Sequence, residues 1–149
     1  MPDPEDQEYS RANVRSEGAA MRSPTQRTLN FLREQGATVK VVERYVRYPN
    51  MVHGVRQDLW GADILAVQGM KLIAIQTCAG ASHSNRVQKS LANDEVQNWL
   101  ATGVLFEIWS WSRRRSDKIL KSGERSHAKV MKCRVTQLTL NGDGHTVIA

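Results

Sequence analysis

The spacing of apolar residues changes along the chain from helical to strand-like, and this change predicts the order of the elements. The first ordered element is expected in SPTQRTLNFLREQG, where Ser23 is a suitable N-cap and Pro24 suits the first helical position. Gln26 completes a capping box, and Gly36 supplies a C-terminal stop. These signals predict a helix over about residues 24–35.

Three strands are expected after this helix. Residues 38–48 are rich in β-branched and aromatic side chains, which indicates a strand, and residues 50–61 are typical of a loop. The runs ADILAV (62–67) and KLIAIQTC (71–78) are nearly continuously apolar and are joined by the short turn QGM. This pattern predicts a hairpin at the centre of a sheet that is covered on both faces.

Helical spacing returns over residues 84–101 and stops at Gly103, and two further strands are expected at 104–111 and 128–140. The predicted order is therefore α-β-β-β-α-β-β. This order predicts an α/β protein with a mixed central β-sheet flanked by helices. The helix at 84–101 should lead to a strand parallel to residues 71–78, because it is long enough to cross the sheet.

The composition suits one globular unit. The chain has 149 residues, of which 40% are hydrophobic, so it can bury a core without cross-links. Residues 1–20 are acidic and polar, and we expect a mobile tail there, followed by a single domain over residues 21–149. No apolar run approaches the roughly 20 residues of a membrane span and no signal peptide is visible, so we expect a cytoplasmic protein without a membrane partner.

The net charge of +6 is unevenly distributed along the chain. Residues 113–149 hold nine basic and three acidic residues, and all nine basic residues fall in the segment 113–134. A basic segment suits a phosphate backbone, because neutralised phosphates release their counterions, although a solvated loop would have the same composition. The residues expected to grip DNA in this segment are Arg113, Arg114, Arg115, Lys118, Lys121 and Arg125.

Two polar residues interrupt the apolar hairpin. Asp63 stands near the start of its first strand and Gln76 near the end of its second, so antiparallel pairing brings both to the same end. Asp58, just upstream, adds a second carboxylate. Oxygen ligands of this kind suit Mg²⁺ or Mn²⁺, which can activate a water molecule for phosphate hydrolysis. For Asp63 a structural role at the end of the strand is the alternative.

The stretch DLWGADILAVQGMKLIAIQTC, with PTQRTLNFLREQG before it and SHSNRVQKSL and GVLFEIWSW after it, resembles the PD-(D/E)XK nuclease superfamily. The resemblance covers residues 21–149 and is greatest to small phage-encoded and Holliday-junction-resolvase-like nucleases. It implies a restriction-endonuclease-like core in which Asp63, Gln76 and the main-chain carbonyl of Thr77 hold the metal ion. It also implies a homodimer acting on branched DNA, with one site for each strand, in a bacterial, archaeal or phage-infected host cell.

This sequence departs from the superfamily pattern at one position. The superfamily has a lysine two residues after the position of Gln76, and Cys78 stands there instead. A thiol with an ordinary pKa is neither a cation nor a strong base. Lys89 and Arg86, on the following helix, are candidates to serve the chemistry, to bind DNA phosphates, or only to solvate the helix.

Resolvase-like members also bring an extra acid to the metal, and Glu43 and Glu34 are the candidates here. Glu43 is preferred because it lies nearer to a central strand, and a cross-strand ion pair with an arginine is the alternative explanation for it. His83 follows the metal-bearing strand and is expected either to contact a phosphate or to serve as a loop or cap residue. Trp60, in a loop, is the aromatic side chain expected to touch DNA.

Other chemistries are disfavoured. Cys78 and His83 are not surrounded by any acyl-transfer signature, so Cys78 is expected to be a small core residue. The two cysteines and four histidines show no paired spacing that would suit zinc, and two cysteines make no disulfide framework.

The sequence therefore predicts a metal-dependent DNA endonuclease that hydrolyses phosphodiester bonds. Asp63 and Gln76 would hold the ion, Asp58 or Glu43 would assist, and Lys89 would replace the missing lysine. Two alternatives remain open. One is a catalytically weak or inactive DNA-binding module of the same fold, and the other is a protein-interaction module in which the basic segment only adds solvation.

Overall fold

The computed structural model describes residues 22–50, 52–140 and 145–148, so the mobile tail predicted at 1–20 lies outside the described residues. The described elements, in chain order, are α2 (Pro24–Glu34), β1 (Thr38–Val41), β2 (Arg44–Val46), β3 (Val55–Gln57), β4 (Ile64–Gln68), β5 (Lys71–Ala79), a 3₁₀ turn (Gly80–Ser82), α3 (His83–Leu91), α4 (Asp94–Ala101), β6 (Leu105–Arg115), β7 (Lys129–Gln137) and β8 (His145–Ile148). None of the helices in these residues is long and apolar enough to cross a membrane.

The first predicted helix is confirmed as α2. Ser23 is its N-cap, since the Ser23 hydroxyl accepts a hydrogen bond of 3.1 Å from the backbone N–H of Gln26. The amide of Gln26 donates to Asn30 instead of returning to the cap, so only one half of the predicted capping box forms. The chain leaves the helix through Gly36, whose φ of +81° lies in the left-handed region that favours glycine.

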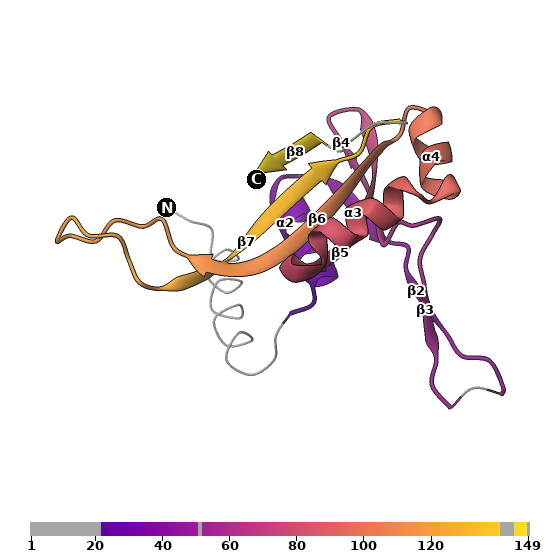
Figure 1. Cartoon of the computed structure of the whole chain (residues 1–149), viewed down its shortest axis with the longest axis horizontal. Coiled ribbons are helices and arrows are strands. Elements are labelled where there is room, and N and C mark those ends of the chain that lie inside the picture. The colour runs from indigo at the N-terminus through magenta and orange to yellow at the C-terminus, as the bar shows by residue number, and fades with distance from the viewer. Residues whose placement is uncertain (1–21, 51, 141–144, 149) are drawn as a thin grey trace.

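The central sheet has six strands in the order β1-β4-β5-β6-β7-β8 (Figure 1). The predicted hairpin is confirmed, because β4 and β5 pair antiparallel from Ile64 opposite Ile75 to Gln68 opposite Lys71. β6 lies parallel to β5, as the crossover through α3 and α4 predicted, and all the other neighbours are antiparallel. The mixed central sheet of an α/β protein is therefore confirmed.

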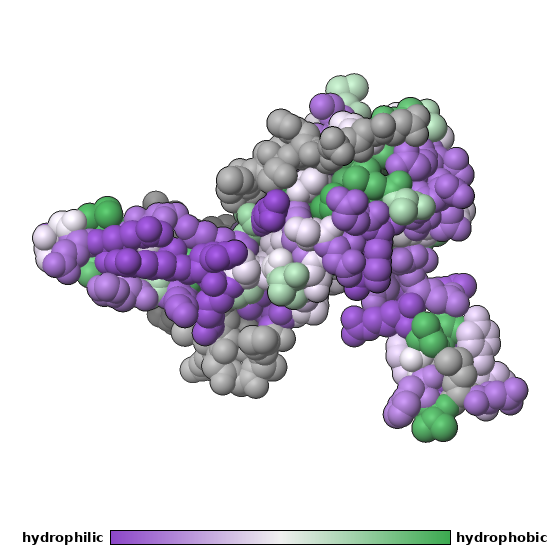
Figure 2. Space-filling model, viewed as in Figure 1, coloured by the Kyte–Doolittle hydropathy of each residue, from purple (hydrophilic) through white to green (hydrophobic). Residues whose placement is uncertain are grey.

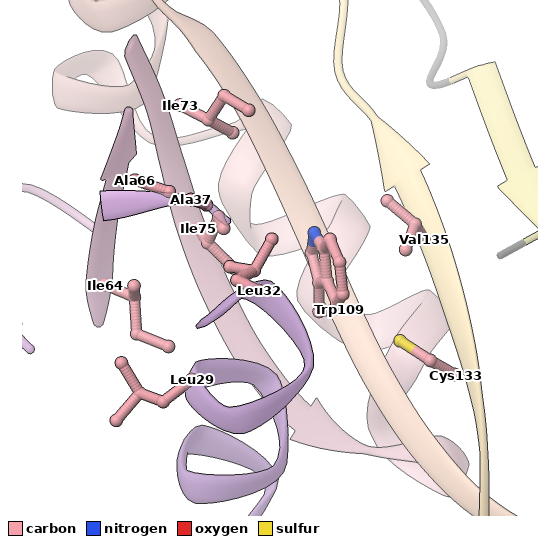
Figure 3. Packing of buried hydrophobic residues seen from close by; sticks show 10 residues of the cluster. All are labelled: Leu29, Leu32, Ala37, Ile64, Ala66, Ile73, Ile75, Trp109, Cys133 and Val135. Carbon is pink, nitrogen blue, oxygen red and sulfur yellow. The ribbon is translucent and has the colours of Figure 1, made fainter. Parts of the chain in front are cut away.

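Helices cover both faces of this sheet. On one face Leu29 and Leu32 of α2 pack on Ile64, Ile75 and Trp109 (Figure 3). On the other face the residues of a second buried cluster, which includes Val96 of α4, pack on the alternate strand positions Ala74, Phe106 and Ile108. The apolar runs of β4, β5 and β6 are nearly continuous because both sides of these strands are buried.

The predicted strand at 38–48 is not a single strand. It breaks after β1, where the backbone N–H groups of Val42 and Glu43 both donate to the carbonyl of Asp63, at 2.9 and 3.2 Å. β2 then pairs with β3 in a separate two-stranded hairpin, and β3 lies in the segment that was predicted to be a loop. Figure 1 shows this β2–β3 hairpin projecting from the body of the protein.

The predicted helix at 84–101 is also divided. It forms α3 and α4, and Asn93 caps the second helix by accepting a 2.9 Å hydrogen bond from the N–H of Glu95. Asparagine is favoured at an N-cap because its side-chain oxygen accepts a hydrogen bond from a first-turn backbone N–H that has no partner within the helix. The two short helices still complete the crossover between the parallel strands β5 and β6.

The basic segment forms a second projection. β6 continues four residues past the predicted end, because Arg113 pairs with Met131 and Arg115 with Lys129 on β7. We call residues 112–132 the β6–β7 arm. It extends away from the sheet in Figure 1, and its visible surface is predominantly hydrophilic in Figure 2. The arginines predicted to lie in a loop therefore begin on an extended ribbon.

Candidate active site

The structure brings Asp63 and Gln76 together at one end of the β4–β5 hairpin. Asp63 immediately precedes β4, and the pairing of Ile64 with Ile75 sets it opposite Gln76 on β5. Both side chains are 92% buried, and both line a cavity of about 300 Å³. We call this cavity the site pocket; its lining residues are Ser23, Pro24, Thr25, Glu43, Arg56, Asp58, Asp63, Gln76, Thr77 and Arg86.

Asp63 is held by one neighbour on β5. Its Oδ2 accepts hydrogen bonds from the backbone N–H of Thr77, at 2.9 Å, and from the Thr77 hydroxyl, at 3.3 Å. Burial raises the pKa of Asp63 to about 6; the Thr77 hydrogen bonds oppose this shift, and the charges of Glu43 and Asp58 add to it. Among the described residues, none donates a hydrogen bond to Asp63 Oδ1. One oxygen of a buried carboxylate is thus left for a ligand.

Gln76 is oriented from the opposite side by α3. Its Oε1 accepts a 3.0 Å hydrogen bond from the hydroxyl of Ser90, and both side chains are buried. A carbonyl oxygen has a second lone pair, so Oε1 can accept from or bind another partner as well. In β5 the carbonyl of Ile75 and the N–H of Thr77 both face Asp63, so by strand alternation the carbonyl of Thr77 faces the same edge.

Glu43 and Asp58 approach the same pocket. Glu43 forms an ion pair with Arg56 at 3.4 Å, which is the alternative that the sequence left open for it, and it lines the site pocket as well. Asp58 Oδ1 accepts a 3.1 Å hydrogen bond from the N–H of Gly61.

In the residues that the structure describes, no three His, Cys, Asp or Glu side chains form a group that could hold a metal ion. A cation here would need amide and main-chain oxygens beside the Asp63 carboxylate. Glu34, at the end of α2, does not line the pocket.

Gly61 shapes the entry to the site. Its φ is +86°, and a Cβ there would lie 2.8 Å from a methyl carbon of Val96 on α4. Only glycine suits both the left-handed backbone and this close approach. The turn from Asp58 to Gly61 therefore sets the position of Asp63 at the start of β4.

The position of the superfamily lysine is occupied by a neutral thiol. Cys78 is buried on the α3 side of β5, and burial raises its pKa to about 11; the nearby charge of Arg86 lowers it and that of Asp63 raises it. Arg86 lines the site pocket, whereas Lys89 is exposed and does not. Of the two cations on α3, the structure therefore brings Arg86 and not Lys89 to the site.

His83 is placed in the core and not at the surface. It is 1% exposed; its Nδ1 lies 2.6 Å from the hydroxyl of Ser110, and its Nε2 lies 2.7 Å from that of Thr136. Burial and the charge of Arg134 lower its pKa, which favours the neutral ring. The expected phosphate contact of His83 is therefore wrong, because both ring nitrogens are already hydrogen-bonded inside the protein.

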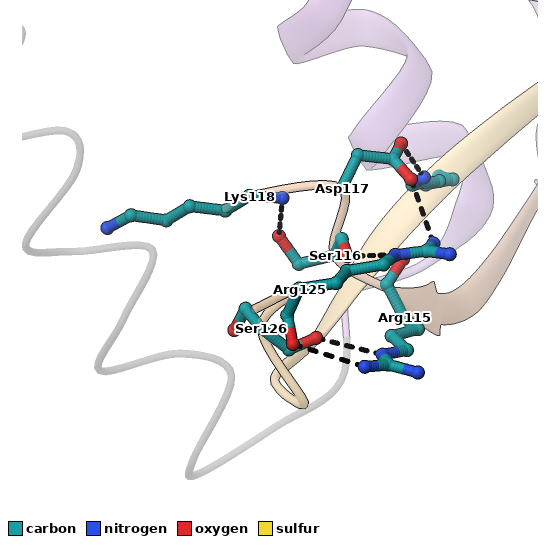
Figure 4. Close-up of polar contacts among 7 residues, drawn as sticks. Arg115, Ser116, Asp117, Lys118, Arg125 and Ser126 are labelled. Atoms are coloured by element: carbon teal, nitrogen blue, oxygen red, sulfur yellow. Dashed lines mark hydrogen bonds and ion pairs between the residues drawn. The ribbon is translucent and has the colours of Figure 1, made fainter. Parts of the chain in front are cut away.

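Two arginines of the basic segment hold the β6–β7 arm together (Figure 4). Arg115 donates to the carbonyls of Arg125 and Ser126, and Arg125 donates to the carbonyls of Arg115 and Ser116 and pairs with Asp117 at 2.8 Å. These bonds close the loop and leave fewer donors for DNA. Arg113, Arg114, Lys118 and Lys121 are exposed on the arm.

Trp60 is half exposed beside Trp99, with ring centroids 5.5 Å apart, and both rings line a separate cavity of about 270 Å³. The indole N–H of Trp99 donates to the carbonyl of Trp60. Trp60 does not line the site pocket, although it belongs to the turn that precedes Asp63.

We compared the chain with protein-family models, with curated proteins and with solved structures, and none of the three comparisons finds a match.

Proposed function

We propose that the protein is a metal-dependent DNA endonuclease with a restriction-endonuclease-like core. The observation that carries this proposal is the site pocket, which is lined by the buried residues Asp63 and Gln76 and also by the arginines Arg56 and Arg86. Acidic oxygens beside fixed cations suit a phosphodiester together with a divalent metal ion. The crossover from β5 to the parallel strand β6 agrees with such a core.

The donor set of the pocket fits Mg²⁺ or Mn²⁺. Asp63 Oδ1 accepts no hydrogen bond from the described residues, and burial raises the pKa of this carboxyl group, so a cation beside it would be favourable. Asp63, Gln76 and the carbonyl of Thr77 would hold the ion, with Asp58 or Glu43 assisting through water. When bound, the ion would supply Lewis-acid stabilisation and a more acidic water.

The residues of the chain would position the phosphodiester for attack. Arg86 and Arg56 bind the nonbridging oxygens and stabilise the extra charge that develops on them. A water oxygen forms the new bond to phosphorus while the bond to the leaving sugar oxygen breaks. Glu43 or Asp58 accepts the proton that the water loses, and the leaving oxygen is protonated from solvent.

The substrate and assembly are proposed by analogy with resolvase-like nucleases. The β6–β7 arm supplies exposed cations for the backbone, and branched DNA is the proposed substrate. A homodimer would place one site on each strand.

Cleavage of four-way-junction and linear DNA in Mg²⁺, Mn²⁺ or chelator tests the proposed function. We expect cleavage with either metal and none with chelator, because Asp63 and Gln76 would otherwise lack the ion. Nicking that persists in chelator would contradict the metal-dependent mechanism. Binding without cleavage in any metal would contradict the enzyme and leave a DNA-binding protein.

The presence of Cys78 in place of the superfamily lysine favours a second candidate function, which is DNA binding without cleavage. The Cys78 thiol has a pKa of about 11, so it stays protonated and neutral at neutral pH. It therefore cannot take a proton from the attacking water, and it does not carry the positive charge of a lysine. The guanidinium of Arg86 supplies a charge but not a base. An inactive module would keep the fold and the basic arm and would bind DNA with a strong salt dependence.

Neutralising Lys118 and Lys121 together should weaken DNA binding and reduce its salt dependence. Each phosphate contact that is lost lowers the slope of log K against log salt by about 0.9, so the double variant with glutamine should lose up to about 1.8. Titration by fluorescence anisotropy at several salt concentrations measures the slope. Lys71→Gln is the matched control, because Lys71 lies at the turn of the β4–β5 hairpin, at the other end from Gln76. A loss of slope in Lys71→Gln that is half the loss in the double variant would show that only net charge matters.

A further inference from the structure

The β2–β3 hairpin begins in the wall of the site pocket. Glu43, just before β2, and Arg56, on β3, line the pocket and form an ion pair with each other. Tyr45 is the register partner of Arg56, and opposed residues of an antiparallel pair project from the same face. Tyr45 therefore lies on the face of the hairpin that continues the pocket wall outward.

The hydroxyl end of the Tyr45 ring is held at the backbone of Gly54. The N–H of Gly54 donates a 2.7 Å hydrogen bond to the Tyr45 hydroxyl, and a Cβ on Gly54 would lie 2.2 Å from the ring carbon Cζ. This end of the ring thus contacts the backbone of Gly54, while Tyr45 remains 65% exposed overall. An aromatic ring that is tethered through its hydroxyl group and remains largely exposed is a surface on which a planar group can stack.

The surroundings of this ring match a nucleic-acid strand. Residues 43–57 carry Arg44, Arg47 and Arg56 against the single acid Glu43, and that acid is already paired. Tyr45 lies two residues along the chain from Glu43 in the pocket wall, and two residues of a strand span about 7 Å. Successive nucleotides of one DNA strand rise about 3.4 Å. On this spacing we expect a base one or two nucleotides from a phosphate in the pocket to come within reach of Tyr45. Figure 2 shows that the surface of this projecting hairpin mixes pale and green residues with hydrophilic ones.

We propose that Tyr45 is a base-stacking residue that holds an unpaired base of the DNA strand whose phosphate occupies the site pocket. This inference rests on the proposed function, and it narrows the substrate class to DNA with unpaired nucleotides beside the bound phosphate. A base in a continuous duplex is stacked on its neighbours and presents no free face, so only an unpaired base can use the ring.

The hairpin contains its own control. Tyr48 is 52% exposed, and its hydroxyl accepts a hydrogen bond from Gln57, whose register partner is Arg44. Gln57 and Arg44 are on the face of the hairpin opposite to that of Tyr45 and Arg56. Tyr48 offers a similar ring away from the pocket wall, so its loss should not affect a base bound beside the pocket.

The test measures binding by fluorescence anisotropy in chelator, with a blunt duplex and a duplex of equal length that contains a short unpaired bubble. Tyr45→Leu should weaken binding to the bubble about tenfold and binding to the duplex less than about twofold. Tyr45→Phe keeps the ring and should retain the preference for the bubble, and Tyr48→Leu should behave like the wild-type protein. A 2-aminopurine in the bubble should change its emission with wild-type protein and not with Tyr45→Leu.

Gly54→Ala provides a second route to the same result. The added methyl group displaces the ring without removing it, so this variant should reproduce the loss seen with Tyr45→Leu. Circular dichroism and thermal unfolding check the fold, and we expect no change because Tyr45 and Gly54 lie outside both buried hydrophobic clusters.

The outcomes separate the stacking role from the proposed function. Equal binding of both DNAs by the wild-type protein, or equal losses on both DNAs in Tyr45→Leu, would overturn the stacking role and leave the nuclease proposal intact. A loss in Tyr48→Leu as large as that in Tyr45→Leu would also overturn it. Absence of binding to either DNA would overturn the proposed DNA function itself, and the stacking role with it.

Discussion

Asp63→Asn is expected to abolish metal-dependent cleavage, with a loss of about a thousandfold or more. Asparagine can still accept the 2.9 Å hydrogen bond from the N–H of Thr77, so the local fold should survive. It removes the only carboxylate in the proposed metal ligand set, and a neutral amide oxygen binds Mg²⁺ far more weakly. Single-turnover cleavage of junction DNA in Mg²⁺ measures the loss.

Glu34→Gln is the matched control for this variant. Glu34 is an exposed acid at the end of α2 and does not line the site pocket, so the same change of charge there should leave cleavage within about twofold of wild type. Undiminished cleavage by Asp63→Asn would show that the pocket is not the active site.

The same substitution should stabilise the protein in the absence of metal. Burial lifts the pKa of Asp63 from its ordinary value of 3.8 to about 6, so the folded state binds this proton more tightly than the unfolded chain does. The stability that this proton contributes is complete below about pH 4 and is lost as the pH rises through about 6. At pH 7.5 the buried charge costs up to about 3 kcal/mol, because one pKa unit corresponds to about 1.4 kcal/mol.

Urea unfolding in chelator at pH 4 and pH 7.5 measures this effect. Asp63→Asn should be more stable than wild type by about 1–3 kcal/mol at pH 7.5 and no more stable at pH 4. Adding Mg²⁺ should raise the stability of wild type and not that of the variant, because only the carboxylate form binds the ion tightly. A variant that is less stable than wild type at pH 7.5 would mean that the charge of Asp63 is compensated by structure and not reserved for a cation.

Arg86→Ala should reduce cleavage about a hundredfold, and Lys89→Ala should change it less than about threefold. Both cations lie on α3, but only Arg86 lines the site pocket, where its charge acts on the thiol of Cys78. A guanidinium at that place can bind two phosphate oxygens, so Arg86→Lys should recover part of the activity.

Single-turnover rates at saturating protein separate this role from simple DNA affinity. If Arg86 stabilises the transition state, the maximal rate falls; if it only binds the backbone, the rate at saturation is preserved and affinity falls instead. A larger loss in Lys89→Ala than in Arg86→Ala would return the catalytic role to the residue that the sequence alone favoured.

Much of the fold could be predicted because its signals are local. Ser23, Pro24 and Gly36 mark the ends of α2, and the apolar runs on either side of Gly69 predict the β4–β5 hairpin. The break between β1 and β2 could not be predicted in the same way. It depends on the carbonyl of Asp63, which is remote in sequence and accepts two hydrogen bonds where the chain turns away from the sheet.

The residues of the candidate site also divide into those that local sequence signals could place and those that depend on remote contacts. Spacing around a tight hairpin was enough to predict that Asp63 and Gln76 meet, because antiparallel pairing leaves few choices of register. The sequence favoured Lys89 over Arg86 for the chemistry, but both are cations on one helix, and only Arg86 lines the pocket. The sequence also made His83 look accessible, although the hydroxyls of Ser110 and Thr136, from β6 and β7, enclose it.

The sequence by itself determined the α/β class, the central hairpin and the pairing of two polar residues at its end, because helix caps, turns and apolar periodicity act between near neighbours. Only the tertiary structure decided which cation lines the pocket, which histidine is buried, and that the β2–β3 hairpin begins in the pocket wall with Glu43 and Arg56. These outcomes depend on contacts between segments distant in the chain, such as β2 with β3 and α3 with the end of β5, and no local pattern encodes them.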